Sequence, residues 1–369
     1  MLERLPPQCL IYRDLTVDMY SALRRFTFIT LLALLGSGAQ AAEKFRLAWS
    51  LYPAYMPWDY ARSAGIIDKW AKKYGIEIEV TQVNDYIEAI NQYSTGGFDV
   101  CMMATMDALT IPAAGGVDST SLIISDYSNG NDVIILKDGK GIEDLRGKQV
   151  NLIEFSISHY FLARALESVG MSERDVTLVN TSDADMVAIY PQPSVGAMVT
   201  WNPMASAILG RNDAVNVFDS KKMPGELTDS VVVNTKTLEK HPELGKALTG
   251  AWFETLAIMQ RDDEQGRKAR ESMGLAAGTN LAGYEQQLKD TYLYYSPEDV
   301  VRLFNSEQLH DSMASIANFS FEKNLLGNGA TSAQAIGITY PGGKVWGDRN
   351  NVKLRFDDRY LRMAIAKEL

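Results

Sequence analysis

Apolar and polar positions alternate in short runs from residue 45 to about residue 114. In residues 76–83 (IEIEVTQV), the apolar Ile76, Ile78 and Val80 are separated by single polar residues, which is the period of a half-buried strand. Longer segments with helical spacing lie between such runs and often end at glycine, a common residue at a helix C-terminus. The pattern predicts alternating strands and helices at residues 45–50, 58–74, 76–83, 86–95, 100–104 and 106–114.

A second set of the same kind begins around a polar link at residues 126–130. It is followed by one isolated strand at residues 230–234 and then by a tail with helical spacing to about residue 326. Within this set the predicted strands and helices are residues 120–125, 132–136, 149–153, 159–169, 176–180, 183–190, 197–200, a helix from Pro203, and 215–218.

Two successive strand–helix sets joined by a return strand predict an α/β fold with two lobes. Each lobe would contain a mostly parallel sheet with flanking helices, and a two-segment hinge would join them. The first lobe would hold residues 43–126 plus 230–369, and the second residues 127–229. Because ligands of open α/β sheets bind at the carboxyl ends of the strands, we expect one shared cleft between the lobes.

The segment before the first strand resembles a cleavable export signal. Arg24 and Arg25 precede an apolar stretch at residues 26–35, which is too short to span a bilayer. Small residues at 39–41 then supply a cleavage motif, so we expect a signal peptide at residues 19–42. Residues 1–18 fit no part of such a leader, and we expect them to be an over-extended start.

Cysteine usage and charge limit the function further. No cysteine follows the small residues of the leader, so we expect no lipid anchor, and Cys101 stands alone after cleavage. The chain carries 36 Lys and Arg against 46 Asp and Glu, a formal net charge of −10. This balance disfavours nucleic acid and anionic membranes as partners and is compatible with a cationic or neutral ligand.

Catalytic and metal-binding motifs are missing from the sequence. His159, His241 and His310 are far apart, and none has a second ligand at metal-binding spacing. His241 and His310 are expected on the surface. No nucleophile elbow, zinc motif or phosphate loop is present. We therefore expect a protein that is not an enzyme and holds neither a metal nor a cofactor.

Aromatic and polar residues gather where the predicted strands end. Aromatic faces can stack on a planar or cationic ligand, carboxylates can accept its N–H groups, and Ser156 and His159 could orient it. Some have structural alternatives: Ser156 and Asp107 could cap helices, Trp201 could be a core residue, and Glu154 could act indirectly. The candidate ligand-binding residues are Trp49, Tyr52, Tyr55, Asp107, Glu154, Ser156, His159, Trp201 and Asp229.

Four segments resemble the nitrate/sulfonate/taurine group of periplasmic solute-binding proteins of ABC transporters. They are residues 46–68 (RLAWSLYPAYMPWDYARSAGIID), 85–109, 142–179 (including DLRGKQVNL and SISHYFLARALESVG) and 195–203 (VGAMVTWNP). The resemblance covers about residues 45–260. It implies the two-lobed periplasmic-binding-protein fold of type II, a periplasmic location and partnership with an inner-membrane permease and ATPase. We expect the protein to be a monomer.

The candidate loops depart from anion-binding relatives because they carry acids and hardly any Lys or Arg. These acids are Asp107, Glu154, Asp183, Asp185 and Asp229. The chain is most similar to the urea- or guanidine-type subgroup associated with urea carboxylase, which implies that it captures guanidine or urea. Taurine, alkylsulfonate or nitrate binding stays open as the alternative within the class.

Two other classes fit the sequence less well. The thiamine-precursor synthases share the fold, but they use a cysteine-rich motif and a histidine that this chain lacks, so an exported enzyme related to them is a remote alternative. The effector domain of a transcription regulator would need an N-terminal helix-turn-helix where the export signal stands.

Overall fold

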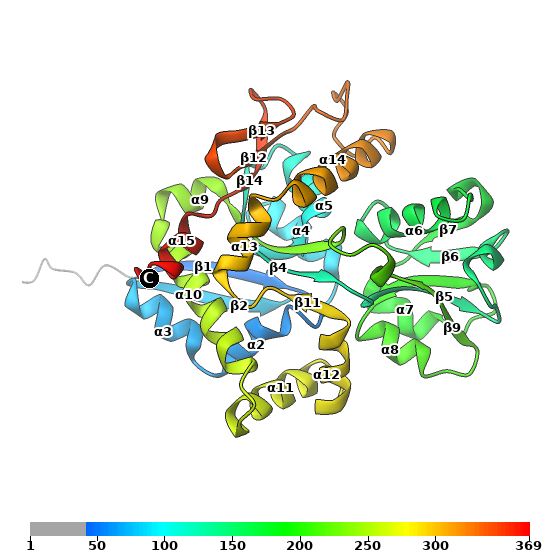
Figure 1. The fold of residues 1–369 in the computed structure, drawn as a ribbon, viewed down its shortest axis with the longest axis horizontal. Helices are drawn as coiled ribbons and strands as arrows, with labels where there is room; N and C mark the ends of the chain where they lie inside the picture. The colour runs from blue at the N-terminus through cyan, green and yellow to red at the C-terminus, as the bar shows by residue number, and fades with distance from the viewer. Residues whose placement is uncertain (1–41) are drawn as a thin grey trace, which may run out of the picture. The chain divides into compact units, whose positions relative to one another are not determined.

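The computed structural model describes residues 42–369, and their strands form two separate sheets (Figure 1). The predicted over-extended start and all of the predicted leader except residue 42 lie outside these residues. Sheet A follows the order β13-β12-β14-β4-β10-β3-β1-β2, with β11 paired to β4, and sheet B the order β7-β6-β8-β5-β9. The two-sheet α/β prediction is confirmed.

Sheet A takes strands from both ends of the described chain. Its members are β1 (Glu43–Trp49), β2 (Ile76–Gln82), β3 (Val100–Ala104), β4 (Ser119–Ser128), β10 (Thr228–Asn234), β11 (Thr291–Leu293), β12 (Gly337–Tyr340), β13 (Lys344–Trp346) and β14 (Val352–Phe356). The helices of the same part of the chain are α2 (Met56–Ser63), α3 (Ile66–Lys73), α4 (Tyr86–Ser94), α5 (Thr105–Ala108), α9 (Thr235–Lys240), α10 (Pro242–Met259), α11 (Glu264–Ala276), α12 (Leu281–Lys289), α13 (Pro297–Phe304), α14 (Glu307–Glu322) and α15 (Arg359–Ile365).

Sheet B is built from a single continuous stretch of the chain. Its strands are β5 (Asp132–Lys137), β6 (Gln149–Leu152), β7 (Thr177–Asn180), β8 (Ala197–Trp201) and β9 (Ala214–Asp219). Its α-helices lie on opposite sides of the sheet (Figure 1), with α6 (Ile157–Glu167) on one side and α7 (Asp183–Ile189) and α8 (Met204–Leu209) on the other.

Both sheets are mixed rather than mostly parallel. In sheet A, β10 runs antiparallel to both β3 and β4, whereas β1 and β3 are parallel. In sheet B, β5 runs antiparallel to β8 and β9, whereas β6 is parallel to β7 and β8. β5 and β10 are the first strands after the chain passes from one sheet to the other, and each runs antiparallel to its neighbours in the new sheet.

Three predicted boundaries differ from the structure. Gly65 adopts a left-handed φ of 71°, so the helix predicted at residues 58–74 is divided into α2 and α3. The predicted link at 126–130 is largely strand, because β4 continues to Ser128 and pairs with β10 and β11. The tail is not helical throughout to residue 326, because the three-residue β11, too short to carry a period, adds to sheet A.

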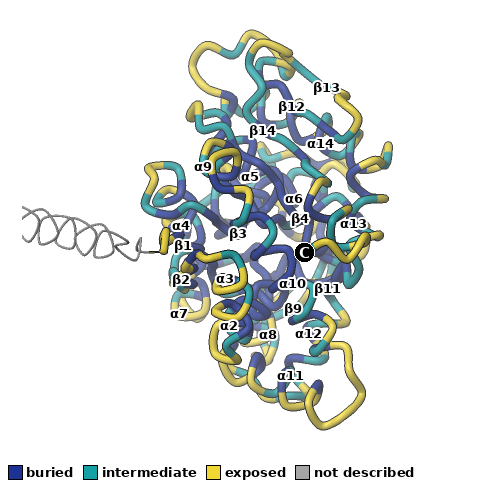
Figure 2. Tube along the Cα trace, turned by 90° about the vertical axis from the view of Figure 1, so that its left-hand side faces the viewer, coloured by how far each residue is buried: buried dark blue, intermediate teal, exposed yellow. Residues whose placement is uncertain are grey.

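The core follows the strands and helix α10 (Figure 2). The rings of Trp58 and Trp252 lie 5.2 Å apart, and the indole N–H of Trp58 donates to the sulfur of Met102. Gly250 lets α10 approach Trp70, because a Cβ there would lie 2.4 Å from that ring. Between residues 42 and 369, no helix has both the length and the apolar character that crossing a bilayer requires.

Candidate functional site

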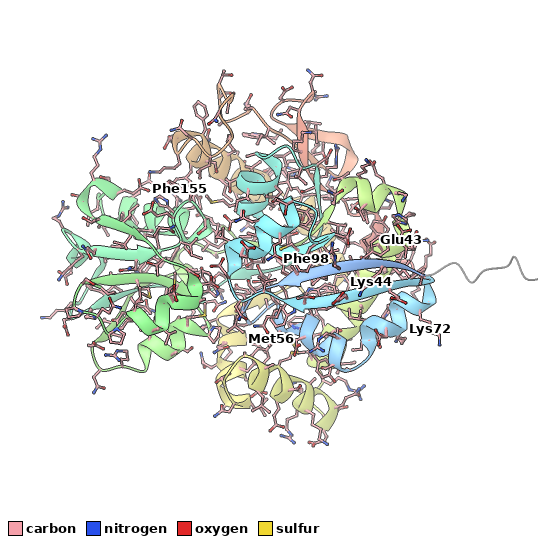
Figure 3. All side chains as sticks on the ribbon, turned by 180° about the vertical axis from the view of Figure 1, so that it is seen from behind. Glu43, Lys44, Met56, Lys72, Phe98 and Phe155 are labelled. Atoms are coloured by element: carbon pink, nitrogen blue, oxygen red, sulfur yellow. The ribbon has the colours of Figure 1, made fainter. Side chains whose placement is uncertain are left out.

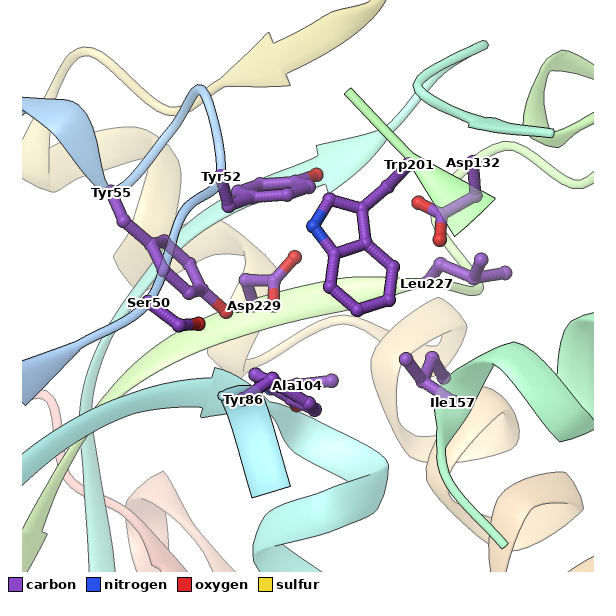
Figure 4. Close-up of a pocket in the computed structure, with 10 residues that line it drawn as sticks. All are labelled: Ser50, Tyr52, Tyr55, Tyr86, Ala104, Asp132, Ile157, Trp201, Leu227 and Asp229. Carbon is purple, nitrogen blue, oxygen red and sulfur yellow. Dashed lines mark hydrogen bonds between the residues drawn. The ribbon is translucent and has the colours of Figure 1, made fainter. Parts of the chain in front are cut away.

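A small cavity of about 30 Å³ lies where strands of both sheets end (Figure 4). From sheet A come the loop that follows β1, the last residue of β3 and the start of β10, and from sheet B come the start of β5 and the end of β8. The residues that line it are Ser50, Tyr52, Tyr55, Tyr86, Ala104, Asp132, Ile157, Trp201, Leu227 and Asp229.

Aromatic rings form much of the cavity wall. The rings of Tyr52 and Tyr55 lie 4.9 Å apart, and those of Tyr86 and Trp201 meet edge to face at 5.8 Å. The indole N–H of Trp201 donates to the carbonyl of Leu51 at 3.0 Å, which ties the end of β8 to the loop after β1. These faces offer stacking surfaces to a planar or cationic group.

Each of the three tyrosines donates its phenol hydrogen to an aspartate. Tyr86 donates to Asp107 at 2.6 Å, and Tyr52 donates to Asp126 at 3.0 Å. The third pair is Tyr55 and Asp229 (Figure 4). Burial raises the pKa of all three phenols well above the usual range, so they remain donors. The phenols thus orient the carboxylates around the cavity.

The carboxyl groups lie in an environment that opposes their ionisation. Burial raises the pKa of Asp107 to about 7 and that of Asp132 to about 6. Burial also raises the pKa of Asp229 and Asp126, and repulsion between these two neighbours and Asp132 adds to the effect. Ionised carboxylates in such a place are stable only beside a positive charge.

No basic side chain of the described chain lines this cavity to supply that charge. The N–H groups at nearby helix starts also have acceptors within the chain. Tyr86 N donates to Asp183 at 3.1 Å, and Ile157 N points to Asp107 at 3.5 Å. In chemical terms, the cavity presents hydrogen-bond acceptors and aromatic faces, a combination that suits a small cation.

Comparison with known proteins identifies the family. The profile of the family described as "NMT1/THI5 like" matches residues 68–265, which is more than half of the chain. The chain belongs to the NMT1/THI5-like family. Among the described residues of this family member, no group of three His, Cys, Asp or Glu side chains is placed to hold a metal ion.

Individual relatives extend the comparison. The taurine-binding periplasmic protein of Escherichia coli K12 is 24% identical over 222 residues, which cover 59% of this chain and 68% of that protein. The alkanesulfonate-binding protein of Xanthomonas axonopodis pv. citri, solved bound to MOPS, superposes with a TM-score of 0.62 at 17% identity, covering 78% of this chain and 96% of the other. The aliphatic sulphonate binding protein of Escherichia coli gives 0.61 at 18% identity, covering 77% and 94%. The structural likenesses show a shared fold.

Four residues predicted from the sequence of this NMT1/THI5-like protein lie together on the cavity wall. They are Tyr52, Tyr55, Trp201 and Asp229. Asp107 is fully buried behind Tyr86 and reaches the cavity through it. Ser156 caps α6, because its side chain accepts from Ser158 N at 3.1 Å. Ligand contact by any of these residues stays a prediction.

The structure does not bring Trp49, Glu154 and His159 to the cavity. Trp49, the last residue of β1, is 1% exposed and packs in the core, since successive strand residues face opposite sides. Glu154 borders a separate groove beside Phe155, an exposed residue with φ of 66° in the loop before α6 (Figure 3). His159 faces Glu173, with Nε2 and Oε1 2.6 Å apart.

The prediction that the remaining two histidines lie on the surface is wrong. His241 is buried, since its ring packs 5.1 Å from that of Phe45, and Nδ1 lies 3.0 Å from Glu243 Oε1. His310 is half-buried, with its ring 4.0 Å from that of Tyr340. Neighbouring aromatic rings from distant parts of the chain explain both positions.

Sequence reasoning missed residues at the beginnings of elements. Tyr86 is the first residue of α4 and Asp132 is the first residue of β5, whereas most of the predicted site residues follow a strand. Asp132 lies at the cavity because β5 is antiparallel, so its first residue is next to the last residue of β8. The short stretch between β4 and β5 could have indicated the position of Asp132. A chain that crosses from one sheet to the other begins its new strand where the two sheets meet, which is also where the cavity lies. The other missed lining residues are Ser50, Ala104, Ile157 and Leu227.

Proposed function

We propose that this protein is the solute-binding component of an ABC importer and that it captures guanidinium in the cavity. The observation that carries the proposal is a set of four carboxyl groups without a basic side chain at the cavity wall. The half-buried Asp229 and the buried Asp132 lie at the wall, and the buried Asp126 and Asp107 lie behind it. The family and its relatives named for taurine and alkanesulfonate binding support the solute-binding class and the periplasmic location.

Guanidinium matches the cavity in shape as well as in charge. It is planar and donates N–H groups around its whole edge, so carboxylates can accept in its plane while tyrosine and tryptophan rings stack on its faces. A volume of about 30 Å³ has room for roughly two water molecules, which suits a very small solute. Urea has the same outline but does not neutralise the carboxylates, so we expect it to bind more weakly.

Capture would be completed by closure of two lobes. The strands of sheet B come from residues 132–219, and those of sheet A come from residues 43–128 and 228–356. This division supports a lobe of residues 43–126 plus 230–369 and a second lobe of residues 127–229, linked by two crossing segments. A monomer that closes about these segments would present one combined surface to a membrane permease, which an ATPase drives.

An alternative is a sulfonate such as taurine, which the names of the relatives favour. Two helix starts, at Tyr86 and Ile157, border the cavity and could serve an anion. The same N–H groups already point at Asp183 and Asp107. The carboxylates could pair with the ammonium group of taurine, but its fully buried sulfonate group would lie without a basic partner, which is unfavourable.

Calorimetric titration of the purified protein tests the proposal. Guanidinium chloride, urea, taurine and sodium nitrate are titrated in turn at constant ionic strength, with tetramethylammonium chloride as a control for cation charge alone. We expect micromolar binding of guanidinium, weaker binding of urea and none of the control cation. Binding of taurine or nitrate without guanidinium would overturn the assignment.

Shortening the aromatic wall should weaken guanidinium binding moderately. Trp201→Phe removes part of the stacking face and the indole N–H that donates to Leu51. A cation–π contact contributes about 0.5–2 kcal/mol, so we expect the dissociation constant to rise by roughly twofold to thirtyfold. Trp346→Phe, on the half-buried strand β13, is the matched control and should bind like the native protein. Equal affinities of the two variants would show that Trp201 is not a ligand contact.

A further inference from the structure

Asp107 occupies an unusual position between the two parts of the fold. It lies in α5, directly after β3, and its side chain is 0% exposed. One carboxyl oxygen accepts from the Tyr86 phenol at 2.6 Å and lies 3.5 Å from the backbone N–H of Ile157, while Oδ1 has no hydrogen-bond partner. The carboxylate of Asp107, in the helix that follows a strand of sheet A, therefore faces Ile157, the first residue of a helix that packs on sheet B.

Helix α6 begins at the wall of the cavity. The helix has 11 residues, and its first residue, Ile157, lines the cavity. N–H groups at a helix start carry partial positive charge and attract anions. Here the neighbouring donors have acceptors within the chain, because Ser158 N donates to Ser156 and Phe155 N donates to His159. The Ile157 N–H faces the Asp107 carboxyl group.

We propose that Asp107 determines the sign of the charge that this site accepts. It does so as a positioning residue, by filling the anion-binding end of α6 with a carboxylate that belongs to the protein and by holding the phenol of Tyr86 in place. This inference rests on the proposed function, since it explains how a fold shared with sulfonate-binding proteins could bind a cation instead.

The physical argument is one of competition. A sulfonate at the start of α6 would compete with the Asp107 carboxyl group for the Ile157 N–H and, where that group is ionised, would meet a like charge in a buried place. The same carboxylate favours a cation in the cavity and leaves the Tyr86 ring fixed against Trp201. Removing Asp107 should therefore act in opposite directions on the two kinds of ligand.

The test compares the full protein with Asp107→Asn and Asp107→Ala by calorimetric titration at pH 8. Each is titrated with guanidinium chloride and with sodium methanesulfonate, and thermal unfolding confirms that each variant is folded. We expect Asp107→Ala to bind guanidinium roughly tenfold or more weakly and methanesulfonate roughly tenfold or more tightly than the native protein. Asp107→Asn, which keeps the shape and removes the charge, should change both affinities in the same directions by less.

Asp263→Asn is the matched control, because Asp263 caps α11 through Gln265 and Gly266 outside the cavity. The affinities of Asp263→Asn for guanidinium and for methanesulfonate should equal those of the native protein. The inference is overturned if folded Asp107→Ala binds methanesulfonate no more tightly than the native protein does. If Asp107→Ala does not fold, the methanesulfonate affinity of Asp107→Asn decides by the same criterion. Failure of the native protein to bind guanidinium would instead overturn the proposed function, while the change in methanesulfonate affinity still tests Asp107.

Discussion

Asp229→Asn is expected to remove most of the guanidinium affinity. Asp229 lines the cavity, is half-buried and is fixed by the Tyr55 phenol. Its neighbours include the buried acids Asp126 and Asp132, and no basic side chain of the described residues lines the wall. Removing one partner of a buried, hydrogen-bonded charge pair costs about 2–5 kcal/mol, so the dissociation constant should rise at least about thirtyfold. Calorimetric titration of the native and variant proteins at pH 8 measures the change.

The ligand-free variant should show the opposite effect on stability. Asn has the shape of Asp but no charge, so Asp229→Asn relieves repulsion from the neighbouring Asp126 and should unfold at a higher temperature than the native protein at pH 8. Asp213→Asn, an acid paired with Arg211 on the surface, is the matched control and should change neither quantity appreciably. Native-like guanidinium affinity in folded Asp229→Asn would exclude Asp229 from the site.

Guanidinium binding is expected to strengthen as the pH rises from 5 to 8. Burial raises the pKa of Asp132 to about 6 and that of Asp107 to about 7, and the pKa of Asp229 is raised as well. Guanidinium remains charged across this range, so at pH 5 it must displace protons from the carboxyl groups, whereas at pH 8 fewer protons remain. We expect affinity to increase at least about tenfold between these two pH values.

The sign follows from proton linkage. An aspartate whose pKa is raised in the folded protein stabilises the fold fully below its ordinary value near 3.8, and this contribution is lost as the pH rises through 6 to 7. A bound cation compensates for this lost stability by neutralising the ionised carboxylates. The rise in melting temperature caused by guanidinium should therefore be larger at pH 8 than at pH 5. Titration in buffers of different ionisation enthalpy should show proton release at pH 5. An affinity that does not change between pH 5 and pH 8 would contradict a carboxylate site.

The local pattern of the sequence was enough to predict the two sets of strands and helices. Period-two runs such as residues 76–83 coincide with β2, because a half-buried strand requires one apolar face. Residues placed directly after strands, such as Tyr52 and Trp201, were found at the cavity for a similar reason: strand ends from different segments meet at one edge of a sheet. The aromatic wall could thus be predicted in part.

Which acids surround the cavity was decided by the tertiary structure. Asp132 lies there because β5 runs antiparallel to β8, and Asp126 lies behind because β4 continues past its predicted end. His159 turns toward Glu173 instead of the cavity, because its rotation about α6 is fixed by packing against Phe319 of α14. Burial, which raises the pKa of the carboxyl groups, depends on such neighbours.

The sequence by itself determined the order and type of most elements, since the spacing of apolar residues selects helix or strand within a short window. Only the tertiary structure decided strand direction, the pairing of Tyr86 with Asp107, and the place of Asp132 at the cavity wall. These features depend on contacts between residues that are distant in the chain, and local spacing carries no information about such contacts.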